Sequence, residues 1–497
     1  MTATDVPAQN STVITRGFLA GDSELQALSG RTTDDLNPVT GQVYARFPAA
    51  DVADVTRVVD AAHAAFETWA GTAPSERRGI LERAADLLVE RAGQFAELMR
   101  QETAGTRTWA EFNISMSATL LRQAATMATR PSGTLLSTDV PGQWSMAVKA
   151  PAGVVVAFVP WNGPLILCTR AVAVALATGN PVVIRPSEDA PLTSGYFLAD
   201  VLRDAGVPAG AINVITNDRA DAPAVVDALI SDKRVRRVNF TGSTAVGRIV
   251  GSIAGRELKP VMLELGGKNP ILVLDDADLD HAANGVALAK FLNAGQICLC
   301  VDRVIVHRAV VDEFTAKFVD KVRALDRGNT NDEHTIVGPM INARAAERVA
   351  GLVADAVAKG ARVLYGGGKP EGAYHPPTVL DAITPQMRIY SEEIFGPVAT
   401  IHTVDDDEQA LALANDTAYG LSSGVYTENA GRGLAVARRL EHGSVHVNDQ
   451  SVADEPEAPV GGVKDSGFGH FGSDWGVEFF TETRWITVAD RHTPYPF

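Results

Sequence analysis

From about residue 154 the chain alternates short β-branched runs with helical segments, and this alternation limits the folds open to it. The run VVVAFVP (154–160) is apolar throughout, as in a strand that is buried on both faces. A helical segment (164–180), a second strand (181–186) and further helix–strand pairs follow. Elements of this length in alternation predict an α/β fold with a doubly wound parallel sheet. Ligands of such sheets bind at the carboxyl ends of the strands.

A second alternating region covers roughly residues 263–450, and two long helices are expected over 51–103. The second of these helices has Ser75 as its expected N-cap. The glycine-rich stretch GGVKDSGFGHFG (461–472) is interpreted as a loop. The segment RWITVAD (484–490) predicts an edge strand, which could pair with a partner chain.

Composition and charge exclude several classes of function. The chain has 497 residues and a formal net charge of −16, which argues against nucleic acid or an anionic membrane as the main partner. No apolar run reaches the roughly 18 residues of a membrane span. The polar start MTATDVPAQNST lacks the apolar core of a secretory signal. Three cysteines form no disulfide framework, so a cytoplasmic location is expected.

Two polar residues stand in settings that suit catalysis. The segment FLNAGQICLC (291–300) contains two of the three cysteines, one of them Cys298. Scattered cysteines are more often inert core residues than nucleophiles, so this segment alone decides nothing. Glu264 ends an apolar stretch between two leucines. A carboxylate buried there must be partnered or have a raised pKa, and a raised pKa suits a general base. The alternative is a surface glutamate on an edge strand.

Two predicted strands end in residues that suit ligand binding. Asn162 follows the first strand, where a side-chain amide can donate to a developing oxyanion, although turn asparagines are common. Gly242 and Ser243 stand where a strand gives way to a helix, whose free N–H groups and positive dipole end suit a phosphate. Gly247 would let that helix pack close to the sheet. Because the G-x-G-x-x-G fingerprint is absent, an ordinary strand-to-helix turn remains an equal interpretation.

Two further groups of polar residues are interpreted as structural. The carboxylates of DDADLD (275–280) precede a helix and suit its N-cap and first turn. His442 and His446 are four residues apart, but their neighbours predict a strand, so the two would not share a helical metal-binding face. No metal site is predicted.

Seven motifs occur in the order found in the aldehyde dehydrogenase superfamily: PWN, RPSE, FTGSTAVG, LELGGKNP, NAGQIC, EEIFGP and GGVKDSGFG. From about residue 35 to residue 490 the chain resembles that superfamily. The resemblance implies four parts: a Rossmann-like NAD-binding domain (1–132 and 154–262), an α/β catalytic domain (263–460), a β oligomerisation arm (133–153 and 481–497) and a return segment that packs on the NAD-binding domain (461–480). A homodimer or a dimer of dimers is expected.

The resemblance also implies a mechanism. Cys298 would be the nucleophile, and Asn162 with the backbone N–H of Cys298 would form the oxyanion hole. Glu264 would activate the water that hydrolyses the thioester to the carboxylic acid. Relatives that transfer the acyl group to coenzyme A lack this glutamate, so hydrolysis is expected.

The expected cofactor residues are Pro160, Trp161, Arg185, Ser187, Glu188, Gly242, Ser243, Leu265, Glu393 and Phe395. Among them, position 185 is Arg where the family usually has Lys. A planar guanidinium can also serve a 2′-phosphate, whereas the carboxylate of Glu188 repels one. NAD is therefore the expected cofactor, with NADP as the alternative.

The expected substrate residues are Arg170, Ile297, Leu299 and Val460. Arg170 stands where many aliphatic-aldehyde members carry an aromatic residue, and its surroundings resemble the benzaldehyde, vanillin and salicylaldehyde dehydrogenase branch. An aromatic aldehyde is the expected substrate. The alternatives are an aliphatic aldehyde or semialdehyde, and a catalytically silent family member with a structural role. Arg170 itself could instead be a structural arginine that is paired with a carboxylate.

Overall fold

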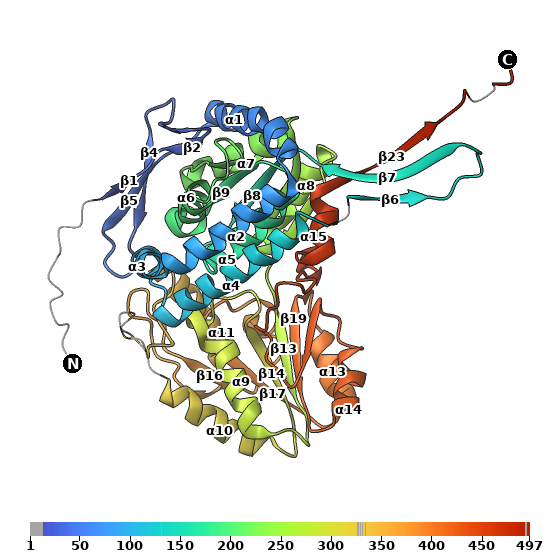
Figure 1. The fold of residues 1–497 in the computed structure, drawn as a ribbon. Helices are drawn as coiled ribbons and strands as arrows, with labels where there is room; N and C mark the ends of the chain where they lie inside the picture. The colour runs from blue at the N-terminus through green and yellow to red at the C-terminus, as the bar shows by residue number, and fades with distance from the viewer. Residues whose placement is uncertain are drawn as a thin grey trace.

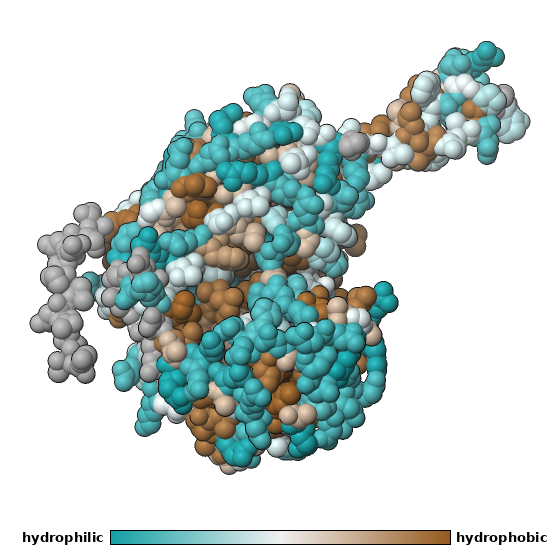
Figure 2. All heavy atoms as spheres, turned by 60° about the horizontal axis from the view of Figure 1, so that its bottom comes forward, coloured by the Kyte–Doolittle hydropathy of each residue, from teal (hydrophilic) through white to brown (hydrophobic). Residues whose placement is uncertain are grey.

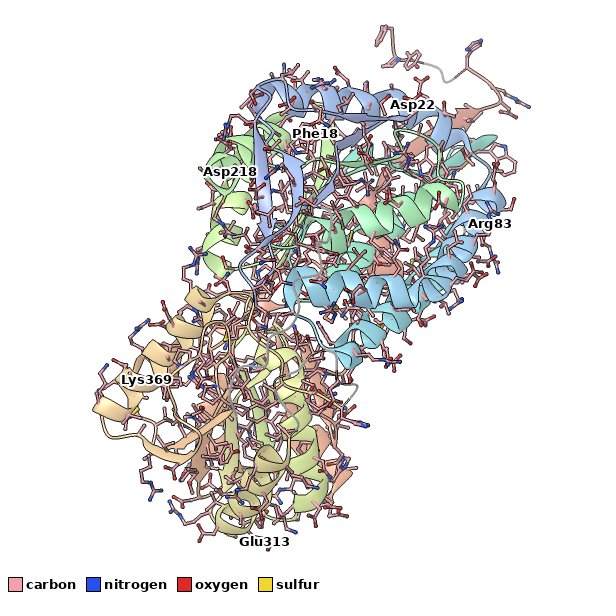
Figure 3. The ribbon with its side chains drawn as sticks, turned by 90° about the vertical axis from the view of Figure 1, so that its left-hand side faces the viewer. Phe18, Asp22, Arg83, Asp218, Glu313 and Lys369 are labelled. Atoms are coloured by element: carbon pink, nitrogen blue, oxygen red, sulfur yellow. The ribbon has the colours of Figure 1, made fainter. Side chains whose placement is uncertain are left out.

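The computed structural model describes residues 13–130, 132–325, 328, 330, 332, 334–492 and 495–497. Figure 1 shows two bodies, one above the other, and a long β arm that projects from the upper body. In the side view of Figure 3, Arg83 and Asp218 lie on the upper body and Glu313 and Lys369 on the lower one. Within these described ranges, no helix is long and apolar enough to cross a membrane.

The upper body is built on an eight-stranded sheet with the order β22-β12-β11-β8-β9-β10-β2-β3. Its strands are β2 (Phe18–Ala20), β3 (Ser23–Leu25), β8 (Val154–Val159), β9 (Val182–Pro186), β10 (Ile212–Val214), β11 (Val235–Thr241), β12 (Val261–Glu264) and β22 (Gly467–Phe468). Strand β8 pairs in parallel with β9 on one side and with β11 on the other. After β8 the chain adds β9 and β10 on one side and then crosses back to add β11 and β12 on the other. This reversal creates a topological switch point beside the carboxyl end of β8.

Helices cover both faces of this sheet, as Figure 1 shows. They are α1 (Val52–Gly71), α2 (Pro74–Glu90), α3 (Ala92–Thr103), α4 (Arg107–Met127), α5 (Pro164–Ala177), α6 (Phe197–Asp204), α7 (Ala222–Ser231), α8 (Thr244–Arg256) and α15 (Ser473–Phe480). In β8, Val155 and Ala157 belong to one apolar cluster, whereas Val156 and Phe158 belong to the other. This two-sided burial explains why the strand is apolar at every position. The doubly wound α/β fold is confirmed.

Two helical predictions need correction. The second long helix of the 51–103 region is two helices, α2 and α3, which meet at Arg91 with φ −95° and ψ 13°. Ser75 is not the N-cap of α2, because Ala73 holds that position and Pro74 is the first helical residue. Proline is favoured there since it lacks the N–H group that a helix leaves unpaired at this point.

The lower body contains a seven-stranded sheet with the order β15-β16-β17-β14-β13-β19-β20. Its strands are β13 (Asn269–Val273), β14 (Val301–His307), β15 (Arg362–Tyr365), β16 (Thr378–Asp381), β17 (Val398–Val404), β19 (Ser422–Tyr426) and β20 (Ser444–Val447). Its helices are α9 (Leu279–Phe291), α10 (Val311–Ala324), α11 (Ala343–Ala358), α12 (Arg388–Ser391), α13 (Asp407–Asn415) and α14 (Ala430–Ala437). As predicted for the acidic stretch, Asp278 caps α9 by accepting the N–H groups of Asp280 and His281.

The arm is a three-stranded antiparallel sheet of β6 (Gly133–Leu136), β7 (Gln143–Pro151) and the edge strand β23 (Thr481–Ala489). Two smaller sheets complete the fold, β1 (Ile14–Thr15) with β5 (Val43–Pro48) and β4 (Thr32–Leu36), and β18 (Tyr419–Gly420) with β21 (Val463–Lys464). The glycine-rich stretch 461–472 is therefore more than a loop, because it contains β21 and also β22, which pairs with β12. The edge strand predicted over 484–490 is confirmed as β23.

Candidate active site

The loop after α9 presents Cys298 through an unusual backbone. Asn293, Ala294 and Gly295 have φ values of +51°, +54° and +73°, so three consecutive residues adopt the left-handed conformation. A Cβ atom at Gly295 would lie 2.3 Å from the carbonyl oxygen of Gly396, so only glycine fits there. The chain thus turns sharply at the end of the helix and directs Cys298 between the two bodies.

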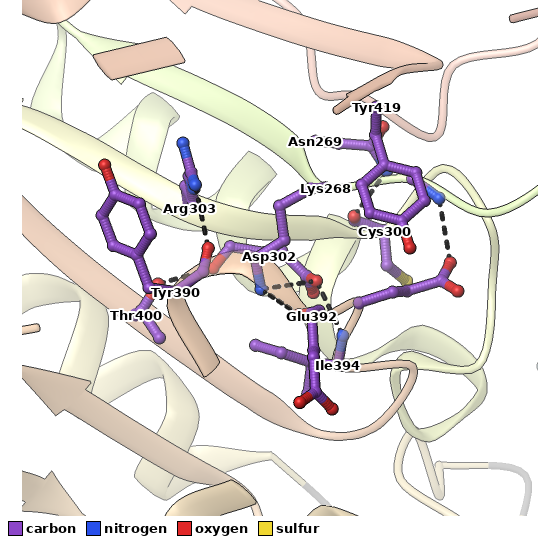
Figure 4. Close-up of polar contacts among 12 residues, drawn as sticks. Lys268, Asn269, Cys300, Asp302, Arg303, Tyr390, Glu392, Ile394, Thr400 and Tyr419 are labelled. Atoms are coloured by element: carbon purple, nitrogen blue, oxygen red, sulfur yellow. Dashed lines mark hydrogen bonds and ion pairs between the residues drawn. The ribbon is translucent and has the colours of Figure 1, made fainter. Parts of the chain in front are cut away.

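Asn269, the first residue of β13, clamps this loop. Its side-chain Nδ2 donates to the carbonyl oxygen of Cys298 at 2.7 Å and to that of Cys300 at 2.8 Å. Figure 4 shows Asn269 beside Cys300. Its Oδ1 accepts the backbone N–H of Ser422 at 3.0 Å. Sequence reasoning did not single out Asn269, although it lies within the LELGGKNP motif. Asn269 could have been predicted from that motif, because it begins the strand that follows Glu264.

Glu264 ends β12, is 3% exposed, and lies beside Cys298. Burial raises the pKa of its carboxyl to about 7, and this rise is opposed by the Cys298 thiol and by the positive charge of Arg170. Burial and the neighbouring Glu264 also raise the pKa of the Cys298 thiol well above its ordinary value. The thiol is therefore protonated at neutral pH, and a carboxyl that can accept its proton lies next to it.

Asn162 lies where β8 ends and α5 begins, at the positive end of the dipole of α5. Its backbone carbonyl accepts the indole N–H of Trp109 at 2.9 Å and the side-chain amide of Asn293 at 2.9 Å. These two donors fix the backbone of Asn162, which lines the same two pockets as Cys298.

Two pockets meet at the three residues Asn162, Glu264 and Cys298. The first is lined by Trp109, Phe112, Asn162, Gly163, Ile166, Leu167, Arg170, Glu264, Ile297, Cys298, Leu299, Val452, Asp454 and Val460. The second is lined by Pro160, Trp161, Asn162, Thr241, Gly242, Ser243, Glu264, Leu265, Gly266, Cys298, Arg348, Glu393 and Phe395. Two different molecules could therefore reach the same thiol from opposite sides.

The first pocket is called the substrate tunnel after the role proposed for it below. It is lined by all four expected substrate residues: Arg170, Ile297, Leu299 and Val460. Its walls are largely apolar. The rings of Trp109 and Phe112 stack with centroids 5.5 Å apart and an interplanar angle of 14°. Sequence reasoning missed this aromatic wall, because nothing in the pattern of α4 distinguishes a ring that faces a tunnel from a ring that packs in the core.

Arg170 lines the first pocket and is also paired with a carboxylate, the arrangement considered as its structural alternative. Its Nη2 donates to the two carboxylate oxygens of Asp454 at 2.8 Å and 2.6 Å. The two side chains are 5% and 10% exposed. Asp454 lies 284 positions along the chain from Arg170, so no local sequence pattern could have paired them.

The second pocket contains seven of the ten expected cofactor residues, namely Pro160, Trp161, Gly242, Ser243, Leu265, Glu393 and Phe395. The Ser243 hydroxyl caps α8 by accepting the N–H of Val246 at 3.4 Å. A Cβ atom at Gly247 would lie 2.4 Å from Leu265 Cδ2, which confirms that glycine allows α8 to pack closely on the sheet. A helix N-terminus at the switch point of a parallel sheet suits the pyrophosphate of a dinucleotide.

Glu393 and Arg348 form the far wall of the second pocket. Glu393 accepts the backbone N–H of Gly267 at 2.9 Å, and burial raises the pKa of its carboxyl to about 7. The Arg348 guanidinium donates to the carbonyl oxygens of Glu393 and Ile394, which holds this loop against α11. Arg348 was missed, because it belongs to none of the seven motifs.

The other three expected cofactor residues, Arg185, Ser187 and Glu188, do not line the second pocket. They follow or end β9, the strand next to β8, so they lie at the same edge of the sheet. Arg185 forms an ion pair with Glu188 and donates through Nε to Asn217 at 2.8 Å. Burial would raise the pKa of Glu188, but the charge and hydrogen bond of Arg185, a backbone hydrogen bond and the charge of Arg219 together lower it.

A buried network joins the segments that position the active site. Asp302 accepts Lys290 Nζ at 2.8 Å, Lys268 Nζ at 3.1 Å and the backbone N–H of Ile394 at 2.9 Å. Figure 4 shows Asp302 with Lys268 and Ile394. The loop that carries Glu393 is thereby tied to the strand that follows Cys298. Among the described residues, no group of three or more His, Cys, Asp or Glu side chains could hold a metal ion.

Comparison with known proteins supports a single family. The family model for the aldehyde dehydrogenase family matches residues 26–486. A vanillin dehydrogenase from Pseudomonas sp. (strain HR199 / DSM 7063) is 47% identical over 96% of this chain and 99% of that protein. A benzaldehyde dehydrogenase [NAD(+)] from Pseudomonas putida is 38% identical over 94% of this chain and 95% of that protein. The crystal structure of a salicylaldehyde dehydrogenase from Pseudomonas putida G7 complexed with salicylaldehyde has a TM-score of 0.94 at 38% identity, covering 97% of this chain and all of that one (100%). The chain therefore belongs to the aldehyde dehydrogenase family.

Proposed function

We propose that this protein oxidises an aromatic aldehyde to the carboxylic acid, with NAD as the cofactor. The observation that carries the proposal is the meeting of two pockets at Cys298, Glu264 and Asn162. One pocket is apolar and has a stacked aromatic wall, which suits an aromatic ring. The resemblance to dehydrogenases of vanillin, benzaldehyde and salicylaldehyde supports the same substrate class.

In the proposed mechanism Glu264 takes the proton of the Cys298 thiol, and the thiolate attacks the aldehyde carbonyl. The side-chain amide of Asn162 donates to the oxyanion of the resulting thiohemiacetal. When bound, a nicotinamide dinucleotide supplies the two-electron acceptor through which the thiohemiacetal becomes a thioester. Glu264 releases the thiol's proton to solvent and, again as a carboxylate, takes a proton from the water that hydrolyses the thioester. Cys298 leaves and receives that proton from Glu264 to become the thiol again, and the acid is released.

NAD rather than NADP is proposed because Arg185 is already engaged. Its guanidinium is paired with Glu188 and bound to Asn217, so the positive charge that a 2′-phosphate needs is neutralised. Comparing kcat/KM for the two cofactors tests this. We expect NAD to be preferred, and Glu188→Gln to raise kcat/KM for NADP while leaving aldehyde selectivity unchanged. A wild-type preference for NADP would overturn the cofactor proposal without affecting the substrate proposal.

A panel of aldehydes tests the substrate class. Benzaldehyde, vanillin and 4-hydroxybenzaldehyde are expected to give higher kcat/KM values than hexanal or succinic semialdehyde, measured as NADH absorbance with NAD in excess. A strong preference for a short aliphatic aldehyde or a semialdehyde would contradict the proposal. The absence of any burst of NADH with every aldehyde would instead favour a catalytically silent protein.

The arm is proposed to bind a second copy of the chain. Trp144 and Trp485 are 62% and 74% exposed on neighbouring strands of the arm, and Val488 is 51% exposed. Figure 2 shows apolar residues along this projection. By the strand register, Trp144 and Val488 lie on one face of the sheet and Trp485 on the other. Large apolar side chains exposed on both faces of a thin sheet with an open edge strand are typical of an interface between subunits.

A further inference from the structure

The ion pair between Arg170 and Asp454 lies in the wall of the substrate tunnel, opposite largely apolar side chains. Arg170 comes from α5, and Asp454 from the segment that follows β20. The Arg170 guanidinium also lies over the ring of Phe471, with 5.8 Å between its Cζ atom and the ring centroid. Among the described residues, Arg170 Nε has no hydrogen-bond partner. The guanidinium therefore has only part of its donor capacity engaged.

The pair also lies close to the reacting thiol. Arg170 and Asp454 both act electrostatically on the Glu264 carboxyl, which lies beside Cys298. A substrate whose carbonyl reaches Cys298 therefore places atoms a few bonds away from its carbonyl near this pair. The charges of Arg170 and Asp454 therefore affect which substituents on an aldehyde fit the tunnel.

A buried guanidinium without a counter-ion is a binding site for a carboxylate, because its N–H donors match the two carboxylate oxygens. Asp454 occupies that position, so the pair is neutral as a whole. An aldehyde that carries its own carboxylate would have to displace Asp454 or remain unpaired beside it. Glu455 and Glu457 are exposed on the same segment and add negative charge to it. Both effects work against anionic substrates and leave uncharged ones unaffected.

We propose that Asp454 is a specificity-determining residue, which occupies the carboxylate position at Arg170 and thereby restricts the tunnel to uncharged aldehydes. This inference rests on the proposed function, since it concerns which aldehydes reach Cys298. The excluded class is that of aldehydes bearing a carboxylate a few bonds from the carbonyl, such as succinic semialdehyde and 3-carboxybenzaldehyde.

The test is Asp454→Asn, which keeps the shape of the side chain and removes its charge. The quantity measured is the ratio of kcat/KM for 3-carboxybenzaldehyde to kcat/KM for benzaldehyde. We expect this ratio to rise about tenfold or more in the variant, because Arg170 becomes available to the substrate carboxylate. The matched control is Glu455→Gln, which removes the same charge from the same segment but touches no guanidinium. Its ratio should change by less than about twofold, as for a screened surface charge.

The double variant Arg170→Gln/Asp454→Asn should lose the gain, because the carboxylate acceptor is then absent. If Asp454→Asn does not fold, as judged by its melting curve, the double variant and Arg170→Gln still decide the matter. Arg170→Gln leaves the Asp454 carboxylate unpaired in the tunnel, so its ratio should fall below that of the wild type, and an unchanged or higher ratio contradicts the inference. The double variant lacks both charges, so its ratio should lie above that of Arg170→Gln. A folded Asp454→Asn enzyme that oxidises benzaldehyde with an unchanged ratio overturns the inference alone. A wild-type enzyme that oxidises neither aromatic aldehyde overturns the proposed function instead.

Discussion

The indole N–H of Trp109 donates to the backbone carbonyl of Asn162 at 2.9 Å. This hydrogen bond joins two parts of the site with different tasks. Trp109, on α4, forms the aromatic wall of the substrate tunnel, and Asn162, after β8, carries the amide proposed to stabilise the oxyanion. A ring bound against Trp109 is thus positioned by a residue that also positions the oxyanion donor.

Replacing Trp109 with Phe should therefore affect chemistry as well as binding. The ring wall is kept, but the donor to Asn162 is lost, so kcat with benzaldehyde should fall about fivefold, the loss expected for one neutral hydrogen bond. Steady-state kinetics measure this effect. In the control Phe112→Leu, which loses an aromatic ring but no hydrogen bond to Asn162, KM should rise while kcat stays within about twofold. Equal kcat values for Trp109→Phe and the wild type would contradict the coupling.

Asn293 offers a second test of the same carbonyl. Its side-chain amide donates to Asn162 at 2.9 Å, and its φ of +51° requires a residue that tolerates the left-handed conformation. Asn293→Asp and Asn293→Gly both tolerate it and both remove the donor. Each should lower kcat about fivefold, with little change in KM for NAD. Should only the glycine variant lose activity, backbone flexibility rather than the hydrogen bond would be the cause.

Glu264→Gln should slow both halves of the reaction, and hydrolysis more than acylation, because a thiol gives up its proton to solvent far more readily than water does. The variant should therefore accumulate acyl-enzyme, and steady-state turnover should fall about 10²–10⁴-fold. Rapid-mixing absorbance would show the NADH formed before turnover stalls. Normal steady-state turnover in this variant would remove Glu264 from the hydrolytic role.

The pH dependence of turnover follows from the same carboxyl. Glu264 works as a base only when ionised, and burial raises its pKa to about 7. Turnover of the wild type should therefore rise as pH increases through about 7 and fall below it. Because burial gives Glu393 a pKa of about 7 as well, Glu393→Gln must be measured alongside. In Glu393→Gln the fall of turnover below about pH 7 should remain at the same pH. A shift of this fall in the variant would show that Glu393 is the group that titrates.

Asp302→Ala should be strongly destabilising. Its removal leaves the ammonium groups of Lys268 and Lys290 buried without a carboxylate, at a cost of about 3–5 kcal/mol in the free energy of unfolding. Although burial alone would raise it, the pKa of Asp302 is lowered by the two lysines, so its contribution exists above about pH 4. It is lost as the pH falls through the lowered value. Denaturant unfolding at neutral and acidic pH measures the difference in the free energy of unfolding between the wild type and Asp302→Ala. This difference should become smaller in acid. In Asp405→Ala, which removes an exposed partner of Arg308, stability should hardly change.

Trp485→Glu should disrupt the proposed pairing of subunits through the arm. A charge in place of an exposed indole opposes burial of the arm against a second copy. Light scattering coupled to size exclusion should show a smaller mass for the variant than for the wild type. The control Val357→Glu changes an exposed residue of α11, 43% accessible and far from the arm in the chain, and should keep the wild-type mass. An unchanged mass in Trp485→Glu would place the interface elsewhere.

The sequence by itself determined the elements and their chemistry. The uniformly apolar run of β8 required a strand buried on both faces, and the alternation around it required a parallel sheet with ligands at its carboxyl edge. The motif residues Cys298, Glu264 and Asn162 could be named because the resemblance to the aldehyde dehydrogenase superfamily implies a role for each, whereas their local patterns alone left structural interpretations open. The helix boundaries at Pro74 and Arg91 were harder, since apolar periodicity continues across such breaks.

Only the tertiary structure decided which residues from distant segments share a pocket. Trp109, Arg348 and Asp454 belong to no motif, yet they line the two pockets that meet at Cys298. Local sequence encodes the period and the polarity of an element, whereas a contact across 284 positions depends on how whole elements pack. The ion pair of Arg170 with Asp454, on which the proposed selectivity for uncharged aldehydes rests, is therefore a product of the tertiary structure.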